Sequence, residues 1–107
     1  MSNEVDPATR QDLIDALALL RERGWTQGTN VDENGCVCTF GALLNAIAPG
    51  ATEWPLNSDH DTAVRLLSGR RALENQIGRR ISGWNDETAR TQADVEAMYE
   101  RTIASLS

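Results

Sequence analysis

Three side chains of the types used in thiol chemistry follow one another along the chain as Cys38, His60 and Asp86. In a cysteine-dependent hydrolase or transferase, a thiolate attacks the substrate, an imidazole removes the proton, and a carboxylate or amide orients the imidazole. Cys38 directly precedes a helical pattern, and the free N–H groups at a helix N-terminus favour a thiolate. These residues, or Asn85 in place of Asp86, define one candidate catalytic set. The alternative, which we favour, is that Cys38 is a buried side chain with a packing role.

Metal binding is a second kind of chemistry that these residue types allow. Cysteine, histidine and aspartate side chains are common zinc ligands. A candidate set here consists of Cys36, Cys38, His60 and either Asp59 or Asp61. Zinc sites usually separate paired cysteines by about two to four residues, whereas a single residue separates these two and no second pair follows. All ten basic residues are arginine, which excludes Schiff-base chemistry and a phosphate-loop lysine. We predict no metal and no cofactor.

The stretch 35–47 contains both cysteines and the only phenylalanine. Residues 36–38 alternate as a short strand would, and apolar residues then recur at the i, i+3, i+4 and i+7 spacing of a buried helix. This change of period predicts a helix that starts at about Thr39, with that residue as its N-cap, and ends at about residue 47. Gly41 inside it would let another backbone or a substrate come close.

Three further segments show helical periodicity. The first covers residues 6–23, with an aspartate and a proline at its start and a glycine after its end. The last opens at Thr91 with a capping-box pattern. A helix in the middle of the chain is expected to be capped by Ser58 or the residue before it, and Gly69 is a point at which it can divide into two.

The predicted fold class is therefore mainly α, a compact single domain over residues 1–107 with four to five helices. Residues 25–34 lose the periodicity and contain several glycine and asparagine residues. They predict a short irregular hairpin or loop between the first two helices. The polar residues 1–5 are expected to be disordered.

The charge is unevenly distributed along this acidic chain, whose net charge is −6. Residues 62–82 carry five arginines and one glutamate, although helical spacing points these arginines in different directions. Such a segment could bind an acidic partner or a phosphate locally, but we expect no direct binding to nucleic acid, because phosphate binding depends on many basic residues. Without a signal peptide or an apolar stretch of membrane length, the sequence predicts a cytoplasmic protein with no membrane contact.

Several motifs in order resemble a known family. They are Gly24-Trp25 with Gln27-Gly28, Cys38 with Gly41-Ala42-Leu43, Trp84-Asn85-Asp86, and Thr91 with Val95. In this order and spacing, from about Leu13 to Ile103, the chain resembles a family of short uncharacterised proteins of actinobacteria and their phages, a domain of unknown function. The resemblance implies a shared compact fold and a shared region around Cys38 and the Trp84 motif, and it brings no activity. Cys36 and His60 are not part of the pattern.

The functional hypothesis that follows is a protein-interaction module. An acidic domain without a cofactor motif, in which tryptophan and arginine can anchor an interface, fits an accessory protein of a phage or mobile element that binds a host or viral protein. We expect a monomer or weak homodimer. The predicted binding surface consists of Trp25, Cys38, Trp84, Asn85 and Asp86, where the late motif folds back against the start of the second helix. The alternative is that Asn85 and Asp86 brace the fold by binding loop amides and capping a helix.

Overall fold

The computed structural model describes residues 6–55 and 57–106, which form five helices. These are α1 (Thr9–Arg23), α2 (Thr39–Ile47), α3 (His60–Ile77), α4 (Ile81–Asn85) and α5 (Gln92–Ser105). The described residues make one domain with a radius of gyration of 12.7 Å, which confirms the mainly α prediction. The expected disorder of residues 1–5 lies outside the described part of the chain.

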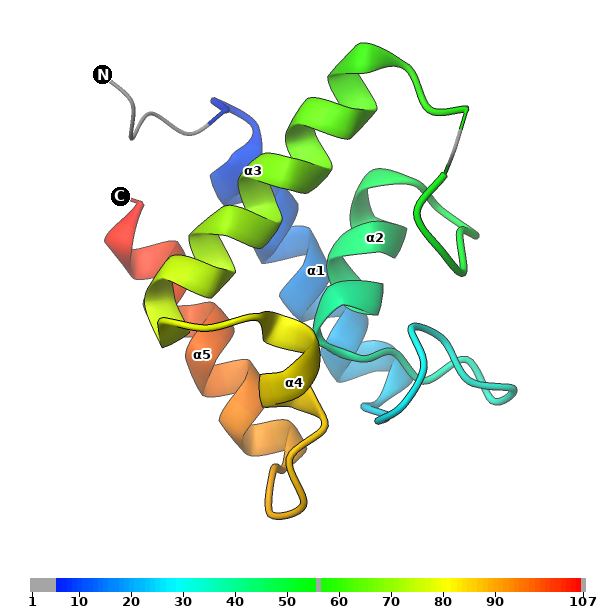
Figure 1. The fold of residues 1–107 in the computed structure, drawn as a ribbon, viewed down its shortest axis with the longest axis vertical. Coiled ribbons are helices and arrows are strands. Elements are labelled where there is room, and N and C mark those ends of the chain that lie inside the picture. The colour runs from blue at the N-terminus through cyan, green and yellow to red at the C-terminus, as the bar shows by residue number, and fades with distance from the viewer. Residues whose placement is uncertain (1–5, 56, 107) are drawn as a thin grey trace.

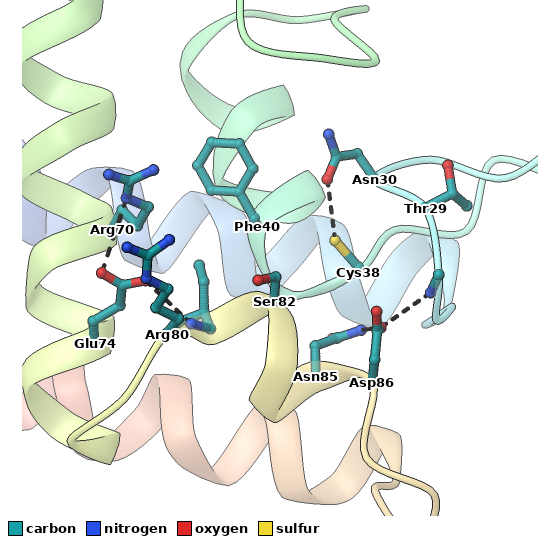
Figure 2. A pocket seen from close by; sticks show the side chains of 12 residues that line it. Thr29, Asn30, Cys38, Phe40, Arg70, Glu74, Arg80, Ser82, Asn85 and Asp86 are labelled. Carbon is teal, nitrogen blue, oxygen red and sulfur yellow. Dashed lines mark hydrogen bonds and ion pairs between the residues drawn. The ribbon is translucent and has the colours of Figure 1, made fainter.

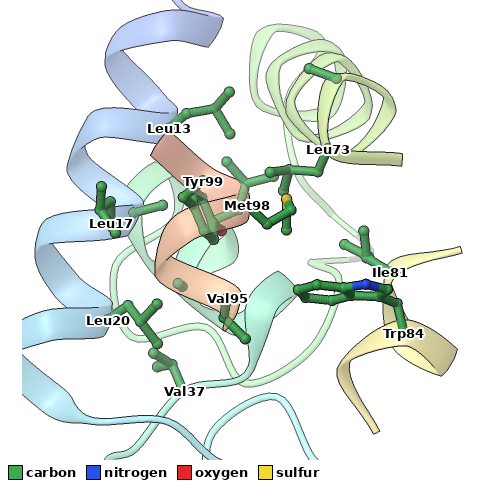
Figure 3. Close-up of a cluster of buried hydrophobic side chains, with 14 residues drawn as sticks. Leu13, Leu17, Leu20, Val37, Leu73, Ile81, Trp84, Val95, Met98 and Tyr99 are labelled. Carbon is green, nitrogen blue, oxygen red and sulfur yellow. The ribbon is translucent and has the colours of Figure 1, made fainter. Parts of the chain in front are cut away.

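The core forms around α2, a short helix that is apolar on nearly every side. Ala42, Leu43 and Leu44 are each 0% exposed, and a helix that is apolar all round must be covered by other elements. Here α1 and α3 pack on α2, while α4 lies at the end where α2 begins (Figure 1). Side chains from α1, α3, α4 and α5 complete the cluster, with Tyr99 of α5 among those that are fully buried (Figure 3).

Gly69 does not divide the third helix, as the sequence allowed, because α3 is continuous from His60 to Ile77. A β-carbon placed on Gly69 would lie 2.8 Å from Leu43 Cδ2. The missing side chain therefore lets α2 and α3 approach closely, and the apolar surface buried there offsets the cost of about 1 kcal/mol for glycine in a helix.

Several of the predicted helix ends are confirmed, including Gly24, which has a φ of 89° and ends α1 at Arg23. The start of α1 lies later than predicted, because the helix begins at Thr9 with Ala8 as its N-cap, and the Asp6 carboxylate accepts the Ala8 amide at 2.8 Å in the turn before it. Thr91 forms a complete capping box at the start of α5.

Two predicted N-caps are wrong by one residue each. Cys38 rather than Thr39 is the N-cap of α2, and its sulfur accepts the amide of Gly41 at 3.2 Å. Asp59 rather than Ser58 caps α3. A carboxylate accepts an amide hydrogen bond more strongly than a hydroxyl does, which favours aspartate for this role.

The segment between α1 and α2 is the irregular hairpin that the sequence predicts. Val37 is fully buried and forms isolated bridges with both Trp25 and Val31. The tip is a turn in which Asp32 Oδ1 accepts the backbone amides of Asn34 and Cys36 at 2.9 and 3.0 Å. This hairpin brings a loop alongside the first turn of α2.

Candidate functional site

Asn85, the last residue of α4, joins three parts of the chain at the start of α2. Its side chain is buried and its Oδ1 accepts hydrogen bonds from Thr39 N at 2.9 Å, Thr39 Oγ1 at 2.6 Å and Trp25 Nε1 at 2.7 Å. Its Nδ2 donates to Thr26 O at 3.3 Å and to Asp86 Oδ1 at 2.9 Å. Both polar atoms of the amide therefore hold α4, the hairpin and α2 together.

These contacts confirm that the late tryptophan motif folds back against the start of α2. Trp84 is buried in the core, and the Arg90 guanidinium lies 3.9 Å from the centre of its ring. Trp25 is half-buried and uses its indole N–H inside the protein, on Asn85. Trp25, Trp84 and Asn85 thus brace the fold, and any part they have in binding a partner stays a prediction.

Gly41 explains how closely the hairpin and α2 meet. A β-carbon at Gly41 would lie 1.9 Å from the backbone oxygen of Asn30, so no other residue fits there without a shift of the backbone. The sequence predicted a close approach at this glycine, and the approaching group is the hairpin backbone.

Cys38 is buried where the hairpin enters α2. Its thiol donates to Asn30 Oδ1 at 3.6 Å and accepts from Gly41 N at 3.2 Å. Burial raises the pKa of the Cys38 thiol above its ordinary value and outweighs the hydrogen bond from Gly41, which lowers it. The expectation that the helix start favours a thiolate is therefore wrong, because removal from water dominates over the helix amides.

His60 lies apart from Cys38. It is an exposed side chain at the first residue of α3, which begins at the end of the molecule away from the start of α2 (Figure 1). Cys38 and Asp86 line one pocket, and His60 is not among the residues that line it. The structure therefore brings together two members of the candidate catalytic set without the proposed base.

The pocket has a volume of about 400 Å³, within the roughly 300–1,000 Å³ that is typical of small-molecule pockets. It lies between the hairpin and the helices α2, α3 and α4. Twelve residues line it: Gly28, Thr29, Asn30, Cys38, Phe40, Arg70, Glu74, Arg80, Ile81, Ser82, Asn85 and Asp86.

The two sides of the pocket differ in charge. Arg70, Arg80 and Glu74 lie on the α3 side, whereas Asn30 lies opposite them on the hairpin (Figure 2). Asp86 lies near the hairpin as well, and its Oδ1 accepts from Gly28 N at 3.0 Å. Positive charge on this pocket is thus confined to the side formed by α3 and the start of α4.

An aromatic pair, of which Phe40 lines the pocket, lies beside the arginine side. The rings of Phe40 and Trp54 are stacked with their centroids 6.1 Å apart and an interplanar angle of 2°, so Trp54 packs against α2. The Arg70 guanidinium lies 5.8 Å from the Trp54 ring centre. Arginine and tryptophan side chains of this kind are enriched where proteins bind one another.

Sequence reasoning missed the convergence of Arg70 and Arg80 because it applied one helical spacing to all the arginines of residues 62–82. The chain leaves α3 at Gly78, whose left-handed φ of 72° ends the helix, and Arg80 then precedes α4. Counting 100° per residue across that break therefore does not describe the relative directions of these two side chains. The signal that could have found them is Gly78, since glycine in the left-handed conformation commonly ends a helix.

Within residues 6–55 and 57–106, no group of three or more histidine, cysteine, aspartate or glutamate side chains is placed to hold a metal ion. In the same part of the chain, no helix has both the length and the apolar character to cross a bilayer.

The fold and the pocket define a small helical domain in which a polar brace holds a pocket of mixed charge. The chain belongs to DUF6197, a family of unknown function whose profile matches residues 4–105. The comparisons with curated proteins and with solved structures gave no match. The resemblance to a family of unknown function is therefore confirmed over almost the whole chain, and it assigns no activity.

Proposed function

We propose that this protein is a small binding module that recognises another protein through the pocket beside Cys38. In this proposal it acts in the cytoplasm, as a monomer or weak homodimer, and serves a phage or mobile element by binding a host or viral protein. The observation that carries the proposal is the pocket itself, which is open, has a volume of about 400 Å³ and is lined by both charged and aromatic side chains.

The position of the polar groups supports binding as the role of this pocket. The brace around Asn85 satisfies the buried polar atoms beneath the pocket, so the floor is preorganised before a ligand arrives. Arg70 and the Phe40–Trp54 pair lie at its edge, and arginine and aromatic residues supply most of the energetically important contacts in protein interfaces.

The chemistry available to Cys38 supports binding over catalysis. A nucleophilic cysteine needs a lowered pKa or an adjacent base. Burial raises the pKa of this thiol, and His60 is not among the residues that line its pocket. Substrate turnover that disappears in Cys38→Ser would instead support a cysteine-dependent hydrolase or transferase.

The proposal is tested by filling the pocket. Ser82 is exposed and lines the pocket, so Ser82→Tyr adds volume there without a change of charge. Affinity purification from the native host with the wild type should recover a partner that the Ser82→Tyr protein loses. Ala18→Tyr places the same side chain on an exposed position of α1, outside the pocket lining, and should retain the partner. Equal recovery by all three proteins would contradict the proposal.

A further inference from the structure

We propose that the pocket binds the carboxylate side chain of an acidic segment in the partner protein, which it receives between Arg70 and Arg80. This inference rests on the proposed protein-binding function and names the chemistry of the partner.

The α3 side of the pocket carries more positive than negative charge. Two guanidinium groups, of Arg70 and Arg80, face a single carboxylate, that of Glu74, which leaves one excess positive charge. Figure 2 shows both guanidinium groups on the same side of the pocket, next to Glu74. A guanidinium binds a carboxylate through paired hydrogen bonds, so an acidic group is the natural complement to this wall.

Glu74 neutralises these arginines only in part. Its Oε2 accepts the backbone amide of Ile81 at 3.1 Å, and its Oε1 lies 4.0 Å from Arg70 Nε, at the outer limit of an ion pair. Within the described residues, Arg80 forms no ion pair and no side-chain hydrogen bond. The N–H groups of the Arg80 guanidinium are therefore available to a ligand, as are most of those of Arg70.

Among the described residues that line it, the opposite wall carries hydrogen-bonded polar groups and the negative charge of Asp86, and no cation. The Asn30 amide donates to Thr52 O at 3.1 Å and accepts from the Cys38 thiol, and Asp86 accepts from Gly28 and Asn85. A ligand therefore gains charge-assisted hydrogen bonds on the arginine side, while the hairpin side shapes the pocket.

The charge of the whole chain selects a short acidic segment over a polyanion. With a net charge of −6, most of the surface repels nucleic acid, and an extended phosphate backbone would lie across that surface. One or two carboxylates inside the pocket meet the arginine wall and avoid most of this repulsion. The stacked Phe40 and Trp54 offer an apolar contact to the residue beside the acid.

The test is a selection of random peptides displayed on phage particles against the full chain, followed by binding measurements. The selected peptides should be enriched in aspartate or glutamate next to an apolar residue. Their dissociation constants should rise about tenfold or more in the double variant Arg70→Gln, Arg80→Gln. Arg71→Gln removes the same charge from an exposed position on α3 outside the pocket lining, and should change binding by less than about twofold. Replacing the acid of the peptide by its amide should abolish the difference between the wild type and the double variant.

The outcomes separate this inference from the proposed function. Peptides that bind the wild type, fail to bind Ser82→Tyr and show no acidic enrichment would overturn the carboxylate inference and leave protein binding supported. Binding of inorganic phosphate or duplex DNA that depends on Arg70 and Arg80, without acidic peptides, would also overturn it. If no selected peptide is sensitive to Ser82→Tyr, both proposals fail.

Discussion

Replacement of Asn85 by alanine should destabilise the domain more than any surface change of the same chemistry. The amide is 1% exposed, and its Oδ1 is the acceptor for three donors at 2.6–2.9 Å. Asn85→Ala leaves the amide of Thr39 and the indole N–H of Trp25 without their acceptor, whereas the Thr39 hydroxyl can rotate toward another one.

The size of the loss follows from those two donors. A buried donor without a partner costs about 1–3 kcal/mol, so two cost about 2–6 kcal/mol. Trp25 is only half-buried, so its indole N–H can bind water if the hairpin loosens. We therefore expect Asn85→Ala to lower the free energy of unfolding by about 4 kcal/mol. A domain of this size has a total stability of roughly 5–15 kcal/mol, so this loss is a large fraction of the whole.

Urea unfolding followed by circular dichroism measures this loss. With a slope of about 1.5 kcal/mol per molar urea, the midpoint should fall by about 2–3 M. The control is Asn75→Ala on the exposed surface of α3, which should stay within about 0.5 kcal/mol of the wild type. If Asn85→Ala does not fold, Trp25→Phe removes one donor only and should cost about 1 kcal/mol. A loss below about 1 kcal/mol for Asn85→Ala relative to Asn75→Ala would refute the role of the brace.

Three further predictions concern a glycine, an acidic cap and the buried thiol. Gly41→Ala should cost about 3 kcal/mol or more in urea unfolding, because its new β-carbon would lie 1.9 Å from the Asn30 carbonyl oxygen. The hydrogen bond from the Thr62 amide lowers the pKa of Asp59. The stability that this cap contributes is therefore fully present above about pH 4 and is lost as the pH falls through the lower folded-state pKa, which a series of urea midpoints at decreasing pH measures. Since burial raises the pKa of the Cys38 thiol, iodoacetamide should label it at pH 7 much more slowly than a free cysteine, as mass spectrometry of tryptic peptides reports.

Each of these predictions has a matched control. Gly69→Ala meets the flexible end of a leucine side chain rather than a backbone oxygen, so it should cost less than Gly41→Ala; the reverse order would contradict the close approach. Asp59→Asn keeps a side-chain oxygen that can cap α3, and it should remove the part of the pH dependence of the urea midpoint that comes from Asp59. Cys38→Ser should leave the total labelling at neutral pH almost unchanged, and a large drop would show that Cys38 is reactive after all.

The sequence was sufficient for four of the five helices, all except α4, and for the meeting of the two motifs. Apolar periodicity located four helical segments, and Gly24 and Thr91 marked two of their ends correctly. The late tryptophan motif contacts the start of α2 as expected. These features are local, or follow from which helix faces are apolar, and a single sequence contains that information.

The pocket was not predictable to the same degree, because it depends on distances between elements. Cys38 was expected to be activated by a helix start, yet its pKa is set by how deeply the hairpin buries it. Arg70 and Arg80 meet only because the chain turns at Gly78 and α4 returns toward the hairpin. Neither effect has a periodic signal in the sequence, and both require the three-dimensional packing.

The bonds around Thr39 have a consequence for how the chain acquires its structure during synthesis. The backbone amide of Thr39 is satisfied by Asn85, 46 residues later, and its carbonyl oxygen accepts the Tyr99 hydroxyl at 2.6 Å, 60 residues later. The ribosome therefore has to release the chain as far as Tyr99 before the central helix finds its permanent partners. We expect this domain to fold late relative to the synthesis of α2, and more slowly than helical bundles whose contacts are mainly between neighbours in the chain.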